Sequence, residues 1–165
     1  MPVQITYQYD ALTRRTRKVN AYGPIDYYYD RQWRAVEERV YSTVTASYVW
    51  SPTDRWTMIR RKRPAESETR YVLKDYLDPA AVIDTSADVV ERFGFDAFGP
   101  VRFMDAAFAP RAASATAWNF LFHAEFLDAD SGLYNYGYRY MHPQLGRWLS
   151  RDPIEELSFT LQRMS

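Results

Sequence analysis

Few residue types in this chain are suited to metal or nucleophilic chemistry. His123 and His142 are its only histidines, and it contains no cysteine. Because a structural zinc ion needs about four convergent ligands, the sequence predicts no zinc site. It also excludes disulfides and cysteine nucleophiles. The stretch Asp128–Gly132 is similar to the start of a calcium loop, but Gly132 comes one position early and no glutamate stands at the twelfth position. We interpret this stretch as a turn and expect no metal or other cofactor.

Alternating tyrosines form the second chemically suggestive pattern: Tyr134, Tyr136, Tyr138 and Tyr140. Side chains at every second position share one face of a β-strand, so the pattern predicts a single strand from Leu133 to Met141. An aromatic face of this kind could stack on sugar rings or on an unfolded protein chain, since tyrosine offers rigid amphipathic area. The competing interpretation, which we favour, is cross-strand aromatic packing within a sheet.

Basic residues cluster at 14–18 and at 60–63, where they could contact phosphate or act as a targeting signal. The whole chain holds 21 Lys and Arg against 21 Asp and Glu, which is not the balance of a protein that neutralises phosphates along a duplex. We therefore expect no nucleic-acid partner, and we expect both clusters to be solvated charge.

Composition and repeats predict an all-β fold. Aromatic residues make up 17% of the chain, and they favour strands. Aromatic stretches end at Asp10 and Asp30, which are 20 residues apart, and again at Asp96. An aspartate can accept backbone N–H groups and initiate a turn, and Gly99 and Gly146 follow where positive φ is needed. We predict successive antiparallel hairpins that form a curved β-ribbon.

Two segments refine this prediction. Residues 81–93 are typical of a strand, a tight turn and a second strand, because β-branched pairs flank polar turn residues. Residues 106–118 are alanine-rich and contain Pro110, which indicates a loop or a short helix. No apolar run approaches the roughly 18 residues that span a bilayer, and the N-terminus has no recognisable signal peptide.

Residues 75–154 resemble the Rhs repeat-associated core of the Rhs/YD-repeat family. The resemblance rests on residues 82–99 and, more specifically, on 127–134, on Tyr138-Arg139-Tyr140 and on 145–154. Residues 1–74 resemble degenerate YD repeats, with Thr13 and Trp33 where that pattern has glycine. We accordingly divide the chain into residues 1–74, the core at 75–154 and a divergent tail at 155–165.

The resemblance implies a β-ribbon that spirals into a hollow shell, which encloses a toxin or serves as a secreted or cell-surface interaction module. It implies a protein cargo, or neighbouring repeats of a larger shell, as partners. Since 165 residues supply too few hairpins to close a shell, we expect a fragment. Unpaired edge strands would then favour self-association.

Some members of the family cleave themselves with a pair of aspartates. The resemblance would assign one of them to Asp152, beside Arg151, but the second has no counterpart in residues 155–165. Two carboxylates must share a proton in this chemistry, so we expect Asp152 to be a turn residue and the protein not to be an enzyme. The leading hypothesis is a non-catalytic scaffold or binding module. A self-cleaving remnant at Asp152 and a carbohydrate-binding surface module remain the alternatives.

Overall fold

The structure is a computed structural model in which residues 4–152 are described. Its regular structure is nearly all β, as predicted, in two antiparallel sheets that do not close. Residues 153–165, including the predicted divergent tail, lie outside the described residues. In residues 4–152 no helix is long and apolar enough to cross a bilayer.

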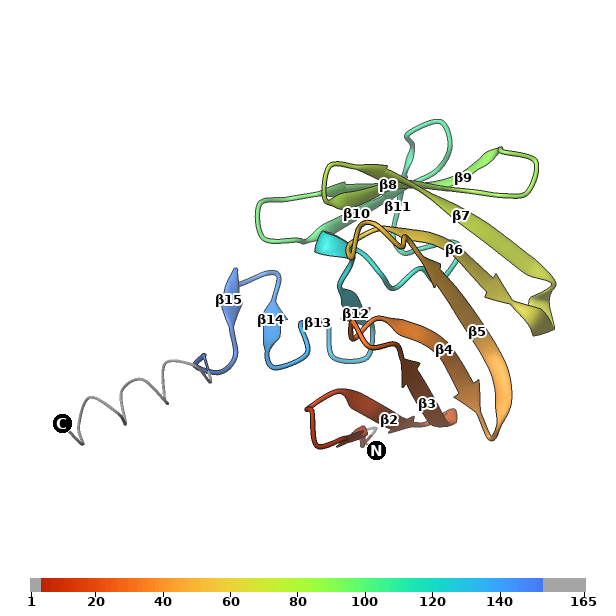
Figure 1. Cartoon of the computed structure of the whole chain (residues 1–165). Coiled ribbons are helices and arrows are strands. Elements are labelled where there is room, and N and C mark those ends of the chain that lie inside the picture. The colour runs from red at the N-terminus through yellow and green to blue at the C-terminus, as the bar shows by residue number, and fades with distance from the viewer. Residues whose placement is uncertain (1–3, 153–165) are drawn as a thin grey trace.

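The larger sheet contains eleven strands that follow one another in sequence order. They are β1 (Thr6–Tyr9), β2 (Arg15–Asn20), β3 (Gly23–Tyr29), β4 (Ala35–Val40), β5 (Thr43–Trp50), β6 (Met58–Arg63), β7 (Glu68–Asp75), β8 (Asp78–Ile83), β9 (Val89–Phe95), β10 (Val101–Met104) and β11 (Pro110–Arg111). Each strand pairs with the next, so the sheet is a ribbon of hairpins that curves around a concave face (Figure 1). The ribbon is continuous at residue 75, where the resemblance places its boundary.

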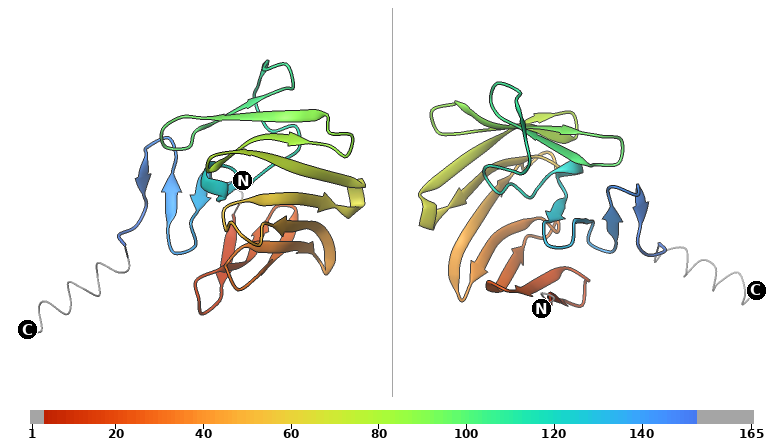
Figure 2. Two further views of the ribbon diagram at one scale, coloured as in Figure 1. Left: turned by 45° about the horizontal axis from the view of Figure 1, so that its top comes forward. Right: turned by 180° about the vertical axis from the view of Figure 1, so that it is seen from behind.

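The smaller sheet follows the ribbon in sequence. It contains β12 (Phe126–Asp128), β13 (Leu133–Asn135), β14 (Tyr140–His142) and β15 (Arg147–Trp148). After β11 the chain turns back toward the concave face of the ribbon, which Figure 2 shows from two further sides. We call residues 112–152 the inner segment. Its Trp118, Leu121 and Tyr134 form one hydrophobic core with ribbon residues such as Tyr48 and Val82.

The same kind of aspartate turn joins successive strands at both edges of the ribbon. The Asp10 Oδ1 atom accepts the backbone N–H groups of Leu12 and Arg14, both at 2.9 Å. Equivalent pairs of bonds form at Asp30, Asp84 and Asp105. At Asp96 the backbone carbonyl accepts the N–H of Gly99 at 2.9 Å. The repeated aspartates therefore reverse the chain by satisfying backbone donors in the turn.

Residues 106–118 contain no helix. Residues 106–109 complete the turn that begins at Asp105, Pro110 and Arg111 form the short β11, and a loop follows. The only helical turns among residues 4–152 are two short 3-10 segments, η1 (Pro64–Glu66) and η2 (Phe122–Ala124). The strand, turn and strand predicted at 81–93 are confirmed as β8 and β9.

The prediction of one strand from Leu133 to Met141 is wrong. The chain forms β13, reverses at Gly137 with φ +82°, and returns as β14. The Tyr136 N–H donates to the Arg139 carbonyl at 2.9 Å and closes this turn. An alternating pattern can continue through both arms of a hairpin, so period two alone did not reveal the reversal. The tyrosines consequently share no face: Tyr134 is 0% exposed and Tyr138 is 60% exposed.

Gly99 shows how tightly the ribbon turns meet the inner segment, and it provides the first prediction. Its φ is +92°, and a Cβ atom there would lie 2.7 Å from the Phe122 ring. We expect Gly99→Ala to lower the free energy of unfolding by about 2–4 kcal/mol, from backbone strain together with overpacking. Urea unfolding followed by tryptophan fluorescence measures this loss.

Gly132→Ala is the matched control. Gly132 also has positive φ, at +70°, but a Cβ atom there would meet nothing within 4 Å. Backbone strain alone should cost about 1 kcal/mol. Equal losses in the two variants would show that the contact between Gly99 and Phe122 does not constrain the fold.

Candidate functional site

A buried carboxylate joins the inner segment to the second strand of the ribbon. Asp128, at the end of β12, is 0% exposed. Its Oδ2 accepts Arg15 Nη1 at 2.6 Å, and its Oδ1 accepts Lys18 Nζ at 2.5 Å. Lys18 also forms an ion pair with Asp130 at 2.5 Å. These contacts connect residues more than 100 positions apart, so they fix where the inner segment lies on the concave face.

The expectation that residues 14–18 are solvated charge is wrong for two of them. Arg15 is only 2% exposed and Lys18 only 5%. The Arg15 guanidinium contacts the rings of both Tyr27 and Phe126, with its central carbon 4.8 Å from each ring centroid. Burial is tolerated because the charge is paired with Asp128 and contacts aromatic faces, which attract cations.

The second basic stretch also contributes a buried cation. Arg61, on β6, is 3% exposed, again contrary to the expectation for residues 60–63. It forms an ion pair with Glu68 at 2.6 Å and donates to the carbonyl groups of Thr116 and Ala117 at 2.6 and 3.0 Å. Its guanidinium lies 4.5 Å from the Trp118 ring centroid. Arg61 thus holds the beginning of the inner segment against the ribbon.

Glu91 on β9 also holds the beginning of the inner segment against the ribbon. Its carboxylate, 0% exposed, accepts the Ala115 N–H at 2.8 Å and the hydroxyl groups of Ser114 and Thr116 at 2.7 and 2.8 Å. A buried polar group needs hydrogen-bond partners, and these three donors supply them. The loop at 114–116 is therefore positioned by hydrogen bonds although it lacks regular structure.

Electrostatics favour the ionised form of Asp128. Burial alone would raise the pKa of this carboxyl group, but the Lys18 hydrogen bond and the positive charges of Arg15 and Lys18 outweigh burial and hold its pKa below the usual value. Asp128 therefore stays charged at neutral pH. Its contribution to stability should be lost only as the pH falls through this lowered pKa.

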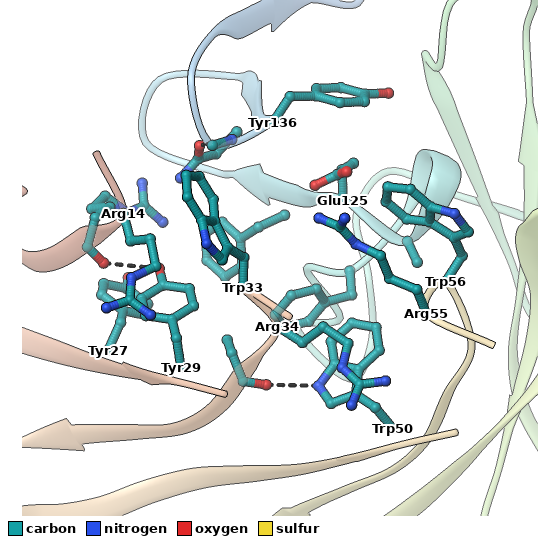
Figure 3. A pocket seen from close by; sticks show the side chains of 17 residues that line it. Arg14, Tyr27, Tyr29, Trp33, Arg34, Trp50, Arg55, Trp56, Glu125 and Tyr136 are labelled. Carbon is teal, nitrogen blue, oxygen red and sulfur yellow. Dashed lines mark hydrogen bonds between the residues drawn. The ribbon is translucent and has the colours of Figure 1, made fainter. Parts of the chain in front are cut away.

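An aromatic cavity of about 80 Å³ opens between the ribbon turns and the inner segment (Figure 3). Six of the rings that line it are those of Tyr27, Tyr29, Trp33, Trp50, Trp56 and Tyr136. Arg14, Arg34 and Arg55 reach it from three successive turns on one edge of the ribbon, and Glu125 faces them from the inner segment. Burial raises the pKa of Glu125 to about 8, although the positive charge of Arg55 partly offsets this.

The four alternating tyrosines have separate partners. The Tyr134 hydroxyl donates to the Gly99 carbonyl at 2.9 Å, and the hydroxyls of Tyr140 and Tyr9 are 2.7 Å apart. The Tyr138 ring packs on Trp33 with centroids 4.7 Å apart, and Tyr136 lines the cavity. Three of them therefore tie the inner segment to the ribbon, and only Tyr136 lies at the cavity.

The remaining predicted residues lie at turns or near the end of the described chain. Gly132 donates its N–H to the Asp128 carbonyl at 2.7 Å, and Gly146 donates to His142 at 2.9 Å. Asp152 forms an ion pair with Arg139 at 3.1 Å, while Arg151 is exposed. In residues 4–152 no group of three or more His, Cys, Asp or Glu is placed to hold a metal ion. The acidic residues of the calcium-like stretch, Asp128 and Asp130, instead bind Lys18.

Comparison with known proteins identifies the fold. No family model matches the chain, and no curated protein matches its sequence. Among solved structures, the crystal structure of TcdB2-TccC3-TEV covers 93% of this chain with a TM-score of 0.64 and 18% identity. The Tc holotoxin pore of Photorhabdus luminescens covers 90% with a TM-score of 0.64 and 20% identity, and TcdB2-TccC3 covers 91% with a TM-score of 0.62 and 18% identity.

These similarities extend over both the ribbon and the inner segment, because the ribbon alone ends at residue 111. The chain spans only 8% of the length of each of these proteins. At this level of identity the likeness shows a shared fold. The same fold therefore occurs as one small part of much larger proteins.

Removing the Asp128 charge tests the buried network. In Asp128→Asn the cations of Arg15 and Lys18 stay buried without their shared counter-charge, so we expect the free energy of unfolding to fall by about 3–5 kcal/mol. Thermal or urea unfolding at neutral pH measures it. In the wild type, the same contribution should begin to fall near the usual carboxyl pKa of about 4 and be lost only as the pH drops through the lowered pKa of Asp128.

Asp26→Asn is the control, because Asp26 forms an ion pair with Arg17 on the neighbouring strands, at the partly exposed surface. Exposed ion pairs are weakened by solvent, so this variant should lose far less stability. Comparable losses of unfolding free energy in both variants would mean that the buried ion pairs of Asp128 contribute no more to stability than an exposed pair.

Proposed function

We propose that the protein is a non-catalytic scaffold, namely the closing part of a β-ribbon shell that encloses or displays a protein partner. One observation carries the proposal: the inner segment folds back into the concavity of the ribbon and is held there by buried ion pairs. A segment used in this way covers the hollow side of the ribbon. This arrangement suits a structural role for the inner segment, as part of the wall of a shell.

The free edge of the ribbon supports an extension into a larger shell. β1 pairs with β2 on one side, and within residues 4–152 no strand pairs with its other side. Its exposed side chains Thr6 and Gln8 carry no charge. Natural edge strands that must stay unpaired usually carry charge, proline or a bulge that discourages pairing. The pairing of β1 with β2 shifts register between Gln8 and Tyr9, so Thr6 to Gln8 form the part of this edge that is suited to accept a further strand.

The comparisons support the same proposal from another direction. The resemblance of residues 75–154 to the Rhs/YD-repeat core implies a shell, and the solved structures that share the fold belong to far longer toxin proteins. In a shell of this kind the wall before β1 would be supplied by further hairpins. The partner would be a protein enclosed by that wall, or the neighbouring repeats themselves.

The β1 edge provides a test. In the full 165-residue chain, the exposed edge should cause concentration-dependent self-association, which sedimentation velocity can follow over about two orders of magnitude in concentration. The double variant Thr6→Lys, Gln8→Lys should weaken this association about tenfold or more. Like charges would then face each other across the edge where two chains pair.

The control places the same two charges on strands that are already paired on both sides, as Val49→Lys on β5 and Ile59→Lys on β6. This control should associate as the wild type does. A wild-type chain that stays monomeric throughout would contradict an edge able to pair. Equal weakening in both double variants would assign the association to a surface other than β1.

A further inference from the structure

The aromatic cavity lies where three turns of the ribbon meet the inner segment. In two of these turns the arginine that borders the cavity forms an ion pair within its own turn. Arg14 is held by Asp10 and Arg34 by Asp30, each through Nε to Oδ2 at 2.7 Å. These arginines border the cavity, but a carboxylate already neutralises each charge. They add little net positive charge to its interior.

The third turn breaks this pattern. Asp54 stands where Asp10 and Asp30 stand, but its carboxylate binds Lys74 at 2.6 Å, and the fourth residue after it is Met58 instead of an arginine. The cation at this turn is Arg55, whose guanidinium lies over the Trp56 ring at 4.8 Å from its centroid. No ion pair or hydrogen bond of the Arg55 side chain is present within residues 4–152.

Glu125 faces this third turn across the cavity (Figure 3). Its carboxylate is partly buried and, within residues 4–152, forms neither a hydrogen bond nor an ion pair. The buried carboxylates of Asp128 and Glu91, by contrast, each accept hydrogen bonds from at least two donors. The positive charge of Arg55 acts on this carboxylate but forms no ion pair with it, so a desolvated carboxylate of this kind still gains from an incoming cation.

The aromatic walls of the cavity also favour a ligand that carries positive charge. The face of an aromatic ring carries negative potential and attracts a cation placed within about 6 Å. Ribbon arginines already use this attraction at the cavity rim, as Arg34 does over Trp50 at 5.9 Å and Arg14 over Tyr29 at 5.7 Å. An anion would meet Glu125 and the ring faces, so Arg55 alone would attract it.

We propose that this cavity binds a monovalent organic cation of the alkylammonium or guanidinium class. Its positive group would lie against the Glu125 carboxylate, and its carbon atoms would lie among the rings of Trp33, Trp56 and Tyr136. The cavity volume of about 80 Å³ accommodates one such group. The cation is either a free small molecule or a basic side chain of a protein partner. The proposal does not depend on the shell function, since it needs only the folded chain.

Small ions test the charge requirement directly in the full chain. Tetramethylammonium and methylguanidinium should give saturable shifts of tryptophan indole N–H signals in NMR spectra. tert-Butyl alcohol, a neutral molecule of similar size, should bind about tenfold more weakly or not at all. Equal binding of the neutral molecule and the cations would overturn the proposal, because the site would then select only for apolar shape.

Glu125→Gln removes the charge and keeps the shape of the side chain. It should weaken cation binding about tenfold or more, while Glu66→Gln should leave it unchanged. Glu66 is the control because it pairs with Arg63 in η1, away from the cavity. Circular dichroism checks that both variants fold. Wild-type affinity in a folded Glu125→Gln variant would overturn the proposal.

The pH profile of the wild type gives a second measurement that needs no variant. The charged or titratable groups that line the cavity around Glu125 are Arg14, Arg15, Arg34, Arg55, Tyr27, Tyr29 and Tyr136. The arginines stay charged and the tyrosines neutral between about pH 6 and pH 9. Because the pKa of Glu125 is about 8, cation affinity should rise across this range. A flat profile would contradict the role of Glu125.

Short peptides then distinguish the two sources of the cation. A glycine-flanked arginine or lysine peptide is compared with the same peptide containing citrulline or acetyl-lysine, which are neutral. Binding of only the charged peptides would assign the site to a basic side chain of a partner. Binding of the small cations without the peptides would assign it to a free small molecule. Equal binding of charged and neutral peptides would overturn the proposal.

Discussion

The position of the inner segment depends on the buried carboxylate of Asp128. A ribbon of sequential hairpins stabilises each strand through its neighbours, but nothing in that arrangement fixes what covers the concave face. Asp128 supplies this constraint by binding two cations of β2, Arg15 and Lys18. Burying three charges is costly, and apolar packing would provide equal or greater stability. The network therefore fixes one docking position, while the shared hydrophobic core supplies most of the stabilisation.

The same reasoning applies along the whole inner segment, which has little regular structure of its own before β12. Glu91 and Arg61 hold its first residues with side-chain hydrogen bonds, and the buried Trp118 ring packs against the Arg61 guanidinium. Backbone polar groups in a buried loop must find partners. Here the ribbon supplies them through charged side chains, which is why clusters that look like solvated charge in the sequence contain buried residues.

The sequence allowed the all-β class, the ribbon of hairpins and the turns at Asp10, Asp30 and Asp96 to be predicted, because each depends on residues close together in the chain. The inner segment could not be predicted in this way. The partners of Asp128 lie 110 and 113 residues away, and no local pattern marks them. The prediction of a single strand for the tyrosines at 134–140 was wrong for a related reason, since an alternating pattern does not reveal where a hairpin turns back.

The degenerate turns explain how the ribbon acquires contacts that a regular repeat would lack. Trp33 stands where the YD-repeat pattern that residues 1–74 resemble has glycine, and its φ is +67°, a conformation that costs a side-chain-bearing residue about 1 kcal/mol. Its ring packs on Tyr138 and lies against Gly137, so the strained turn reaches the inner segment directly. Glycine at 33 would relax the backbone but remove this contact and one wall of the aromatic cavity. Tryptophan at this turn therefore accepts local strain in return for a long-range contact, and that contact makes this turn differ from the other turns of the same edge.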